Sequence, residues 1–190
     1  MNPYGQWQQG GAAPSIFGAL PSLPATNPPT AMPDSVTFTF TNFKTTVLNS
    51  TILGPQQRTA YRVVTEPTAP ACTIFKDNES RNVAMVQWQP HPTVEIRGVA
   101  AKQRVRDWLR LSSDQSRRVM EIRGVQYAWA PVDGFICVSK MQSAAPRVLA
   151  RVARVPNVVI LEMTQEAMQA GMLEPCLVAA AMMTCGHNID

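Results

Sequence analysis

Histidine is scarce in this sequence, and so are the motifs that organise most enzyme active sites. The two histidines are His91, which stands between two prolines, and His187, near the end of the chain. Imidazole-based acid–base or nucleophilic catalysis therefore has few candidates. No phosphate-binding glycine loop, no H-E-x-x-H motif and no G-x-S-x-G motif occurs. Carboxylates are sparse, without the dense acidic loop that calcium needs. We expect a protein that is not an enzyme and that uses no metal or cofactor.

Cysteine is also scarce, and its positions are scattered. The four cysteines are Cys72, Cys137, Cys176 and Cys185, and they form neither a C-x-x-C pair nor a cluster with histidine. Two of them lie in an apolar segment, where a reduced cysteine behaves as a small hydrophobe. We expect free structural thiols rather than disulfides or metal ligands.

Targeting signals and membrane-spanning runs are missing from the sequence. The first residues lack the basic region and apolar run of a secretory signal. The longest apolar run is clearly shorter than the roughly 20 residues that span a bilayer. These absences predict an intracellular, cytoplasmic protein, which could still act at a membrane surface as a peripheral protein.

Charge is absent from residues 1–33, which hold seven prolines and a glutamine-rich run. Such a segment cannot bury enough surface to offset the entropy lost on ordering. Since 190 residues suit one domain plus a tail, we expect a disordered tail over 1–34 and one folded domain over 35–190. A small apolar island around Phe17 could dock on a partner, although an isolated apolar patch in a linker is the more ordinary interpretation.

Short strands dominate the rest of the chain. Residues 36–43 alternate strictly, which places Val36, Phe38 and Phe40 on one face and threonines on the other. Further runs rich in β-branched and aromatic residues follow at roughly 8–12-residue spacing, and a tight hairpin is predicted at Arg123-Gly124. The predicted strands cover residues 36–43, 46–53, 59–65, 71–75, 83–88, 93–97, 119–123, 125–130, 135–139, 148–153 and 158–163.

One helix near the end of the chain is predicted to be buried. Every residue from Cys176 to Met183 is apolar, and alanine and methionine are good helix formers. Pro175 fits a first helical turn and Gly186 fits the position just past the end, while Gly171 and Pro175 suggest a break near the start. A helix that is apolar all round must be buried on every side. The predicted fold is mainly β (α+β), with about 11–12 antiparallel strands in a closed barrel around this helix.

A basic segment occupies the middle of the chain. Between residues 97 and 154 twelve lysines and arginines stand against four acids, whereas residues 155–190 hold four acids and no lysine or arginine. Within this segment, residues 100–111 fit two periodicities. In a helix Val105, Trp108 and Leu109 share an apolar face, and in a strand Lys102, Arg104 and Arg106 share a basic one. The pattern does not decide between them.

Several of these runs resemble the tubby-like barrels, the superfamily that includes the LURP-one-related domains and the phospholipid scramblases. More specifically, the chain resembles an uncharacterised group of fungal domains of that type. The resemblance covers about residues 36–186, and it implies about twelve strands closed around a hydrophobic helix near the C-terminus. The matching segments are residues 38–53, 61–65, 83–88, 102–109 with its Asp-Trp-Leu ending, 124–129, and 158–163 leading into the terminal helix.

Tubby proteins bind phosphoinositides, so the resemblance implies an anionic lipid headgroup as a candidate ligand. Six basic residues within seventeen positions could hold its phosphate groups. The ordinary alternative is a solvated basic face. Nucleic acid is not expected as a partner, because Trp108 is the only aromatic residue among these positions and fits a core residue better. The candidate ligand-binding residues are Lys102, Arg104, Arg106, Arg110, Arg117 and Arg118.

Two non-catalytic functions therefore remain open from the sequence. One is binding of anionic phospholipid headgroups at a membrane surface through the basic face. The alternative is a protein-interaction or self-assembling structural module that recruits a partner through its proline-rich tail, residues 1–34.

Overall fold

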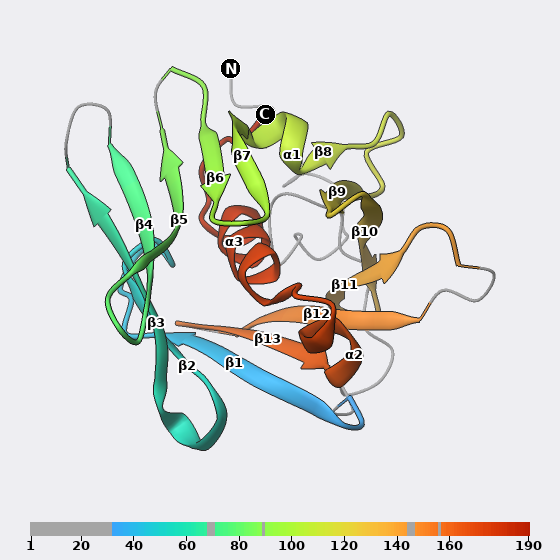
Figure 1. The fold of residues 1–190 in the computed structure, drawn as a ribbon, viewed down its shortest axis with the longest axis horizontal. Helices are drawn as coiled ribbons and strands as arrows, with labels where there is room; N and C mark the ends of the chain where they lie inside the picture. The colour runs from blue at the N-terminus through green and yellow to red at the C-terminus, as the bar shows by residue number, and fades with distance from the viewer. Residues whose placement is uncertain (1–31, 68–70, 89, 144–146, 156) are drawn as a thin grey trace, which may run out of the picture.

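The computed structural model describes residues 32–67, 71–88, 90–143, 147–155 and 157–190. Within these ranges the chain is mainly β, and thirteen antiparallel strands form a single sheet (Figure 1). The predicted tail lies almost wholly outside the described residues. The first strand begins at Ser35, where the folded domain was expected to begin.

The strands follow one another along the chain with short connections. They are β1 (Ser35–Thr41), β2 (Ser50–Leu53), β3 (Thr59–Glu66), β4 (Cys72–Asp77), β5 (Asn82–Gln87), β6 (Thr93–Ile96), β7 (Ala100–Arg104), β8 (Arg110–Leu111), β9 (Arg118–Ile122), β10 (Val125–Val132), β11 (Phe135–Lys140), β12 (Val148–Val155) and β13 (Val158–Thr164). The helical elements are η2 (Pro55–Gln57), α1 (Val105–Trp108), α2 (Gln165–Gln169) and α3 (Leu173–Thr184).

Alternation and turn chemistry explain most of these strands. In β1, Phe38 and Phe40 are buried as predicted, and in the β9–β10 hairpin Arg123 and Gly124 both adopt positive φ between the paired residues Ile122 and Val125. Each of the eleven predicted strands overlaps an observed one. The second is shorter than predicted, because residues 46–49 turn and the amide of Asn49 donates to the carbonyl of Thr46.

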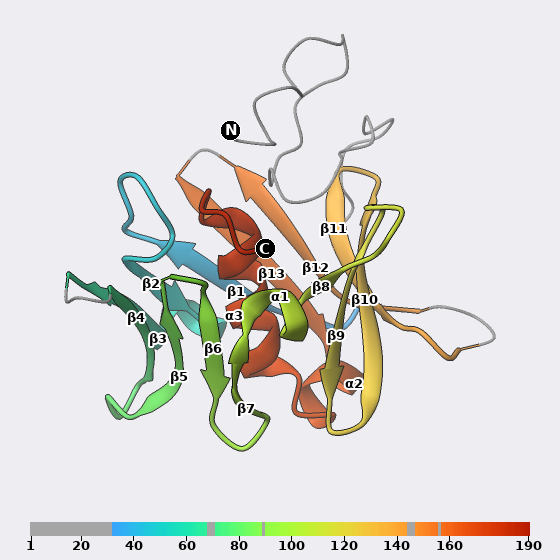
Figure 2. The same cartoon turned by 90° about the horizontal axis from the view of Figure 1, so that it is seen from above.

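The sheet is open, so the prediction of a closed barrel is wrong. Its strand order is β7-β6-β5-β4-β3-β2-β1-β13-β12-β11-β10-β9-β8, in which β1 pairs with β13 and joins the two halves. β7 and β8 are the two ends, and no ladder joins them in the described ranges. The helical turn α1 lies between these two ends (Figures 1 and 2).

Side-chain burial in residues 105–109 explains why the sheet does not close. A strand would place Trp108 on the opposite face from Val105 and Leu109, whereas a helical turn places all three on one face. All three are at most 3% exposed, and the amide of Leu109 donates to the carbonyl of Val105 over 2.7 Å. The chain therefore leaves the sheet after Arg104 and rejoins it at the two-residue strand β8, which pairs with β9 and not with β7.

The long helix α3 confirms the prediction for residues 176–183. Every residue from Pro175 to Thr184 is buried. The helix contacts β12 and β13 on one side and β5 on another, and Figure 1 shows it within the curve of the sheet. The expected break is also present, because Gly171 adopts φ +69° between α2 and α3.

Candidate functional site

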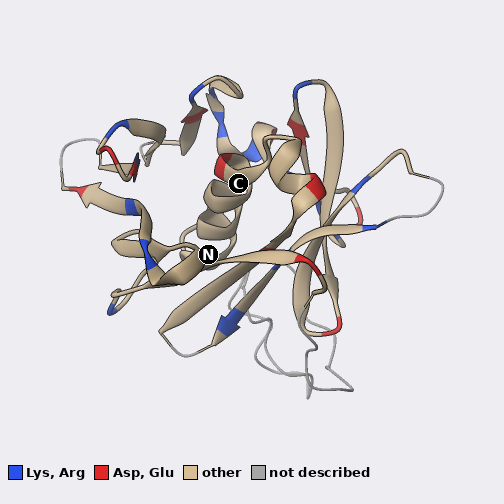
Figure 3. Cartoon of the chain, turned by 60° about the horizontal axis from the view of Figure 1, so that its bottom comes forward, with Lys and Arg blue, Asp and Glu red and all other residues tan. Residues whose placement is uncertain are grey.

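Five of the six predicted ligand-binding residues are exposed on consecutive elements. Lys102 and Arg104 belong to β7, Arg106 to α1 and Arg110 to β8, and Arg117 precedes β9. We call these five residues the basic seam, because they lie on the two end strands of the sheet, on the helical turn that connects them and just before β9. Figure 3 marks the basic and acidic positions along the described ribbon, in which the part after β12 carries acids alone.

The buried face of α1 positions the seam. Val105, Trp108 and Leu109 pack into the core, so Arg106 and Asp107 are left on the exposed side. The amide of Val105 donates to the carbonyl of Pro92 over 2.9 Å, which fixes the start of the turn beside β6. The two periodicities of the sequence thus each hold for part of the segment, a strand as far as Arg104 and a helical turn after it.

Two members of the seam have acidic neighbours. The Nε atom of Arg106 lies 3.9 Å from Oδ1 of Asp107. Arg117 lies near Asp114, whose pKa is lowered to about 2 by the Ser112 hydroxyl, by the backbone and hydroxyl donors of Ser116, and by the Arg117 charge. In contrast, Lys102, Arg104 and Arg110 form no salt bridge within the described ranges. These three are the cations most available to a ligand.

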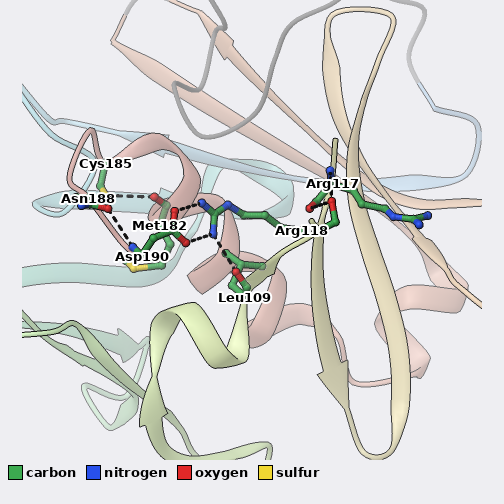
Figure 4. Close-up of polar contacts among 8 residues, drawn as sticks. Leu109, Arg117, Arg118, Met182, Cys185, Asn188 and Asp190 are labelled. Atoms are coloured by element: carbon green, nitrogen blue, oxygen red, sulfur yellow. Dashed lines mark hydrogen bonds and ion pairs between the residues drawn. The ribbon is translucent and has the colours of Figure 1, made fainter. Parts of the chain in front are cut away.

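Arg118 is not part of this surface, and its assignment as a ligand-binding residue is wrong. Its side chain is fully buried, and Nη1 and Nη2 donate to Oδ1 and Oδ2 of Asp190 over 2.9 and 2.7 Å. Nη1 also donates to the carbonyl of Leu109 over 3.0 Å, so both groups converge on the guanidinium (Figure 4). The guanidinium is therefore already occupied by the protein's own acceptors.

The register of β9 explains this burial. Arg118 pairs with Trp129 of β10, which is 0% exposed, so Arg118 lies on the inner face together with Met120 and Ile122. Arg118 precedes Met120 by two residues and Ile122 by four, so the sequence already indicated that the three share a strand face. The sequence did not indicate that Asp190 is the partner of Arg118, since Asp190 lies 72 residues away.

The remaining candidates have structural positions. Trp108 is 3% exposed and, with Tyr127 and Trp129, belongs to the core, as expected for packing residues. All four cysteines are buried and free, which confirms the prediction of structural thiols. Across the part of the chain that the structure describes, no group of three or more His, Cys, Asp or Glu side chains could hold a metal ion. No helix in that part is long and apolar enough to cross a membrane.

Comparison with known proteins gives one match. A family model described as a family of unknown function, DUF6593, matches residues 45–183. No curated protein and no solved structure matches the chain. The matched region runs from the residues before β2 to the last turn of α3, so it includes the basic seam and nearly all of the sheet. The chain therefore belongs to the DUF6593 family.

Proposed function

We propose that this protein is a non-catalytic domain that binds anionic phospholipid headgroups at a membrane surface through the basic seam. The supporting observation is the run of five exposed cations on β7, α1, β8 and the turn before β9. Three of them, Lys102, Arg104 and Arg110, have no salt-bridge partner in the described ranges. Long, exposed basic side chains spread over several elements suit many phosphate groups in a plane better than one ligand in a pocket.

The expected affinity is modest and depends on salt. Each lysine or arginine near an anionic membrane contributes about 1 kcal/mol, so three unpaired cations would supply roughly 3 kcal/mol. That attraction corresponds to an increase in binding of about two orders of magnitude over a neutral membrane. Because the Debye length at physiological ionic strength is roughly 8 Å, added salt would weaken it further.

We also infer that the fold is an open variant of the tubby-like barrel. The inference is supported by antiparallel strands that pair mostly with their sequence neighbours, by the pairing of β1 with β13, and by a fully buried helix after the last strand. The chain departs from the resemblance at the seam, where β7 and β8 do not pair.

Vesicle flotation tests the lipid proposal. The full chain should float with vesicles that contain phosphatidylserine or phosphoinositide at low salt, and it should not float with pure phosphatidylcholine vesicles. Replacing Lys102, Arg104 and Arg110 together with glutamine should remove most of this binding. The free energy of unfolding of the variant should lie within about 1 kcal/mol of the parent's value, because exposed charges contribute little to stability.

A matched control separates the seam from net charge. Lys44, Arg58 and Arg62 are exposed and form no salt bridge in the described ranges. Changing all three to glutamine removes the same charge and should leave flotation nearly intact. If flotation falls equally in the seam variant and in the control variant, the binding is a non-specific attraction that depends on net charge alone. Failure of the parent chain to float would reject the lipid proposal and leave the protein-interaction module as the better hypothesis.

A further inference from the structure

A cavity of about 550 Å³ lies beside the start of α3, and no residue of the basic seam lines it. Its walls come from β1, β3, the β4–β5 turn, the end of β6 and the first turn of α3. The volume falls within the range of roughly 300–1,000 Å³ that is typical of small-molecule sites. The polar side chains in its wall are Tyr61, Asp77, Asn78, Arg81, Arg97 and Glu174, and Phe38, Ala60, Val83 and Leu173 supply apolar surface.

A hydrogen bond between two distant elements holds one carboxylate in the cavity wall. The hydroxyl of Tyr61, on β3, donates to Oε1 of Glu174 over 2.9 Å. Burial raises the pKa of Tyr61, and the nearby Glu174 charge and its hydrogen bond raise it further, so the phenol stays protonated as a donor. Glu174 also lies in the first turn of α3, where the helix dipole favours a negative charge. Its second oxygen, Oε2, has no hydrogen-bond partner among the described residues.

Two other charged residues in the wall are already satisfied by the protein. The carboxylate of Asp77 accepts from the backbone amides of Glu79 and Arg81 over 2.9 Å each, and from Nε of Arg81 over 2.7 Å. Arg81 also forms an ion pair with Glu79 over 2.8 Å. These contacts fix the β4–β5 turn as one rim of the cavity, and they leave Asp77 and Arg81 little capacity for a ligand.

Arg97 is the cation that remains available. It is exposed, and it has no salt bridge within the described ranges. Its backbone amide donates to the carbonyl of Val83 over 2.9 Å, and Gly98 follows with φ +70°, so the backbone position of Arg97 is set by the β6–β7 turn. The cavity thus presents one open guanidinium and one open carboxylate oxygen in the same wall.

We propose that this cavity binds a small zwitterion, with its ammonium group on Glu174 and its phosphate or carboxylate group on Arg97. The wall charges cancel in two pairs, Asp77 with Arg81 and Arg97 with Glu174, so a ligand without net charge leaves no unpaired charge in the site. A ligand with only one charged group would leave the other wall residue without a partner, and its affinity would be lower for that reason. Phe38 and Leu173 suit a short apolar stem between the two charged groups.

Titration of the isotopically labelled full chain tests the proposal by backbone amide NMR. The probes are sn-glycero-3-phosphoethanolamine and β-alanine, which carry no net charge near neutral pH and place an ammonium group across a short CH₂ stem from a phosphodiester or a carboxylate. Ethanolamine and inorganic phosphate serve as the two halves. We expect saturable shifts at Tyr61, Arg97 and Glu174 with at least one zwitterion at millimolar concentration. Each half should bind at least about tenfold more weakly, which corresponds to about 1.4 kcal/mol.

Conservative variants assign the two ends of the ligand. Glu174→Gln keeps an oxygen that can accept from Tyr61 but removes the charge, and it should weaken binding of the zwitterion at least tenfold by the same conversion. Arg97→Gln should do the same. Arg62→Gln, on the exposed side of β3, is the control that should leave binding unchanged. Melting curves of all three variants verify that the fold is kept.

Each outcome decides the proposal. Saturation by glycerophosphoethanolamine alone indicates a phosphate zwitterion, and saturation by β-alanine alone indicates a carboxylate one. Phosphate or ethanolamine binding as tightly as the zwitterions would overturn the proposal in favour of a simple ion site. The absence of shifts at the cavity with both zwitterions would reject it. The triple variant of the basic seam should bind the zwitterion like the parent, so failure of the lipid proposal does not affect this one.

Discussion

Arg118 and Asp190 form a bidentate ion pair that ties the end of the chain to β9 beside the open end of the sheet. The guanidinium is fully buried, and the Asp190 side chain is 35% exposed. Between α3 and Asp190 the chain makes further contacts. The ring of His187 lies 4.9 Å from that of Trp88, just after β5, and Ile189 is 2% exposed. The segment after α3 therefore connects strands from both halves of the open sheet.

Removing the carboxylate of Asp190 should destabilise the protein. In Asp190→Ala the Arg118 guanidinium stays in the core with only the carbonyl of Leu109 as an acceptor among the described residues, where Nε already lacks one. The expected loss is about 2–3 kcal/mol in free energy of unfolding, since hydrogen bonds to charged groups are typically worth that much and Asp190 is partly exposed. Urea denaturation measures it. Asp107→Ala, at an exposed acid, should cost less than about 0.5 kcal/mol.

A double-mutant cycle shows whether the loss comes from the unpaired charge. Arg118→Met replaces the guanidinium with an apolar chain of similar length, and in that background Asp190→Ala should cost less than about 1 kcal/mol. If Asp190→Ala costs the same in both backgrounds, the two residues are not coupled and the ion pair does not hold the tail.

Substitution of Gly171 tests the local backbone geometry between α2 and α3. Its φ is +69°, and a Cβ atom there would lie 3.2 Å from Nη1 of Arg123. Gly171→Ala should therefore suffer both backbone strain and displacement of Arg123, with an expected cost of about 2 kcal/mol. Gly186 is a matched control, because its φ is +77° and no atom lies within 4 Å of the added Cβ. Gly186→Ala should cost about 1 kcal/mol, the strain alone. If the two variants lose the same stability in thermal denaturation, the Arg123 side chain moves away from the added methyl group at no measurable cost.

The sequence predicted the strands and the long helix better than it predicted whether the sheet closes into a barrel. Alternation located β1 because Phe38 and Phe40 have to share a buried face, and composition located α3 because an all-apolar helix has no face to expose. Closure depended on residues 100–111, where strand and helix patterns overlap. The buried contacts of Trp108 decide between them, and they are tertiary contacts that no local pattern encodes.

The candidate sites were predictable only in part. Exposure of Lys102, Arg104 and Arg110 follows from their charge. Arg118 has the same charge but shares a strand face with Met120, and the acid that permits its burial is distant in sequence. The cavity was harder still to predict from the sequence. Its wall combines residues from β3, the β6–β7 turn and α3, whose proximity depends on the whole fold.

Thiol reactivity tests the burial of the cysteines. Burial raises the pKa of Cys137 and of Cys185 to about 11, and it raises the pKa of Cys176 further still. Since the thiolate is the nucleophile, a raised pKa leaves little reactive thiolate at pH 8. The folded chain should react slowly with a thiol reagent, and denaturant should release four fast-reacting thiols. Rapid labelling of Cys137 or Cys185 without denaturant would contradict the buried positions.

The packing of α3 gives the last prediction. Ala180 is 0% exposed in the middle of this helix, and it belongs to the core cluster together with Phe40 and Leu161. A well-packed core has no room for three extra carbon atoms, so Ala180→Leu should force displacements that cost about 1–3 kcal/mol. Ala170→Leu makes the same change at an exposed position between α2 and α3, and it should be nearly neutral. The midpoints of urea denaturation of the two variants measure the difference in stability, provided that the free energy of unfolding falls with the same slope against urea concentration in both. If Ala180→Leu is as stable as Ala170→Leu, the helix is not packed on all sides and the core is looser than the burial of its residues indicates.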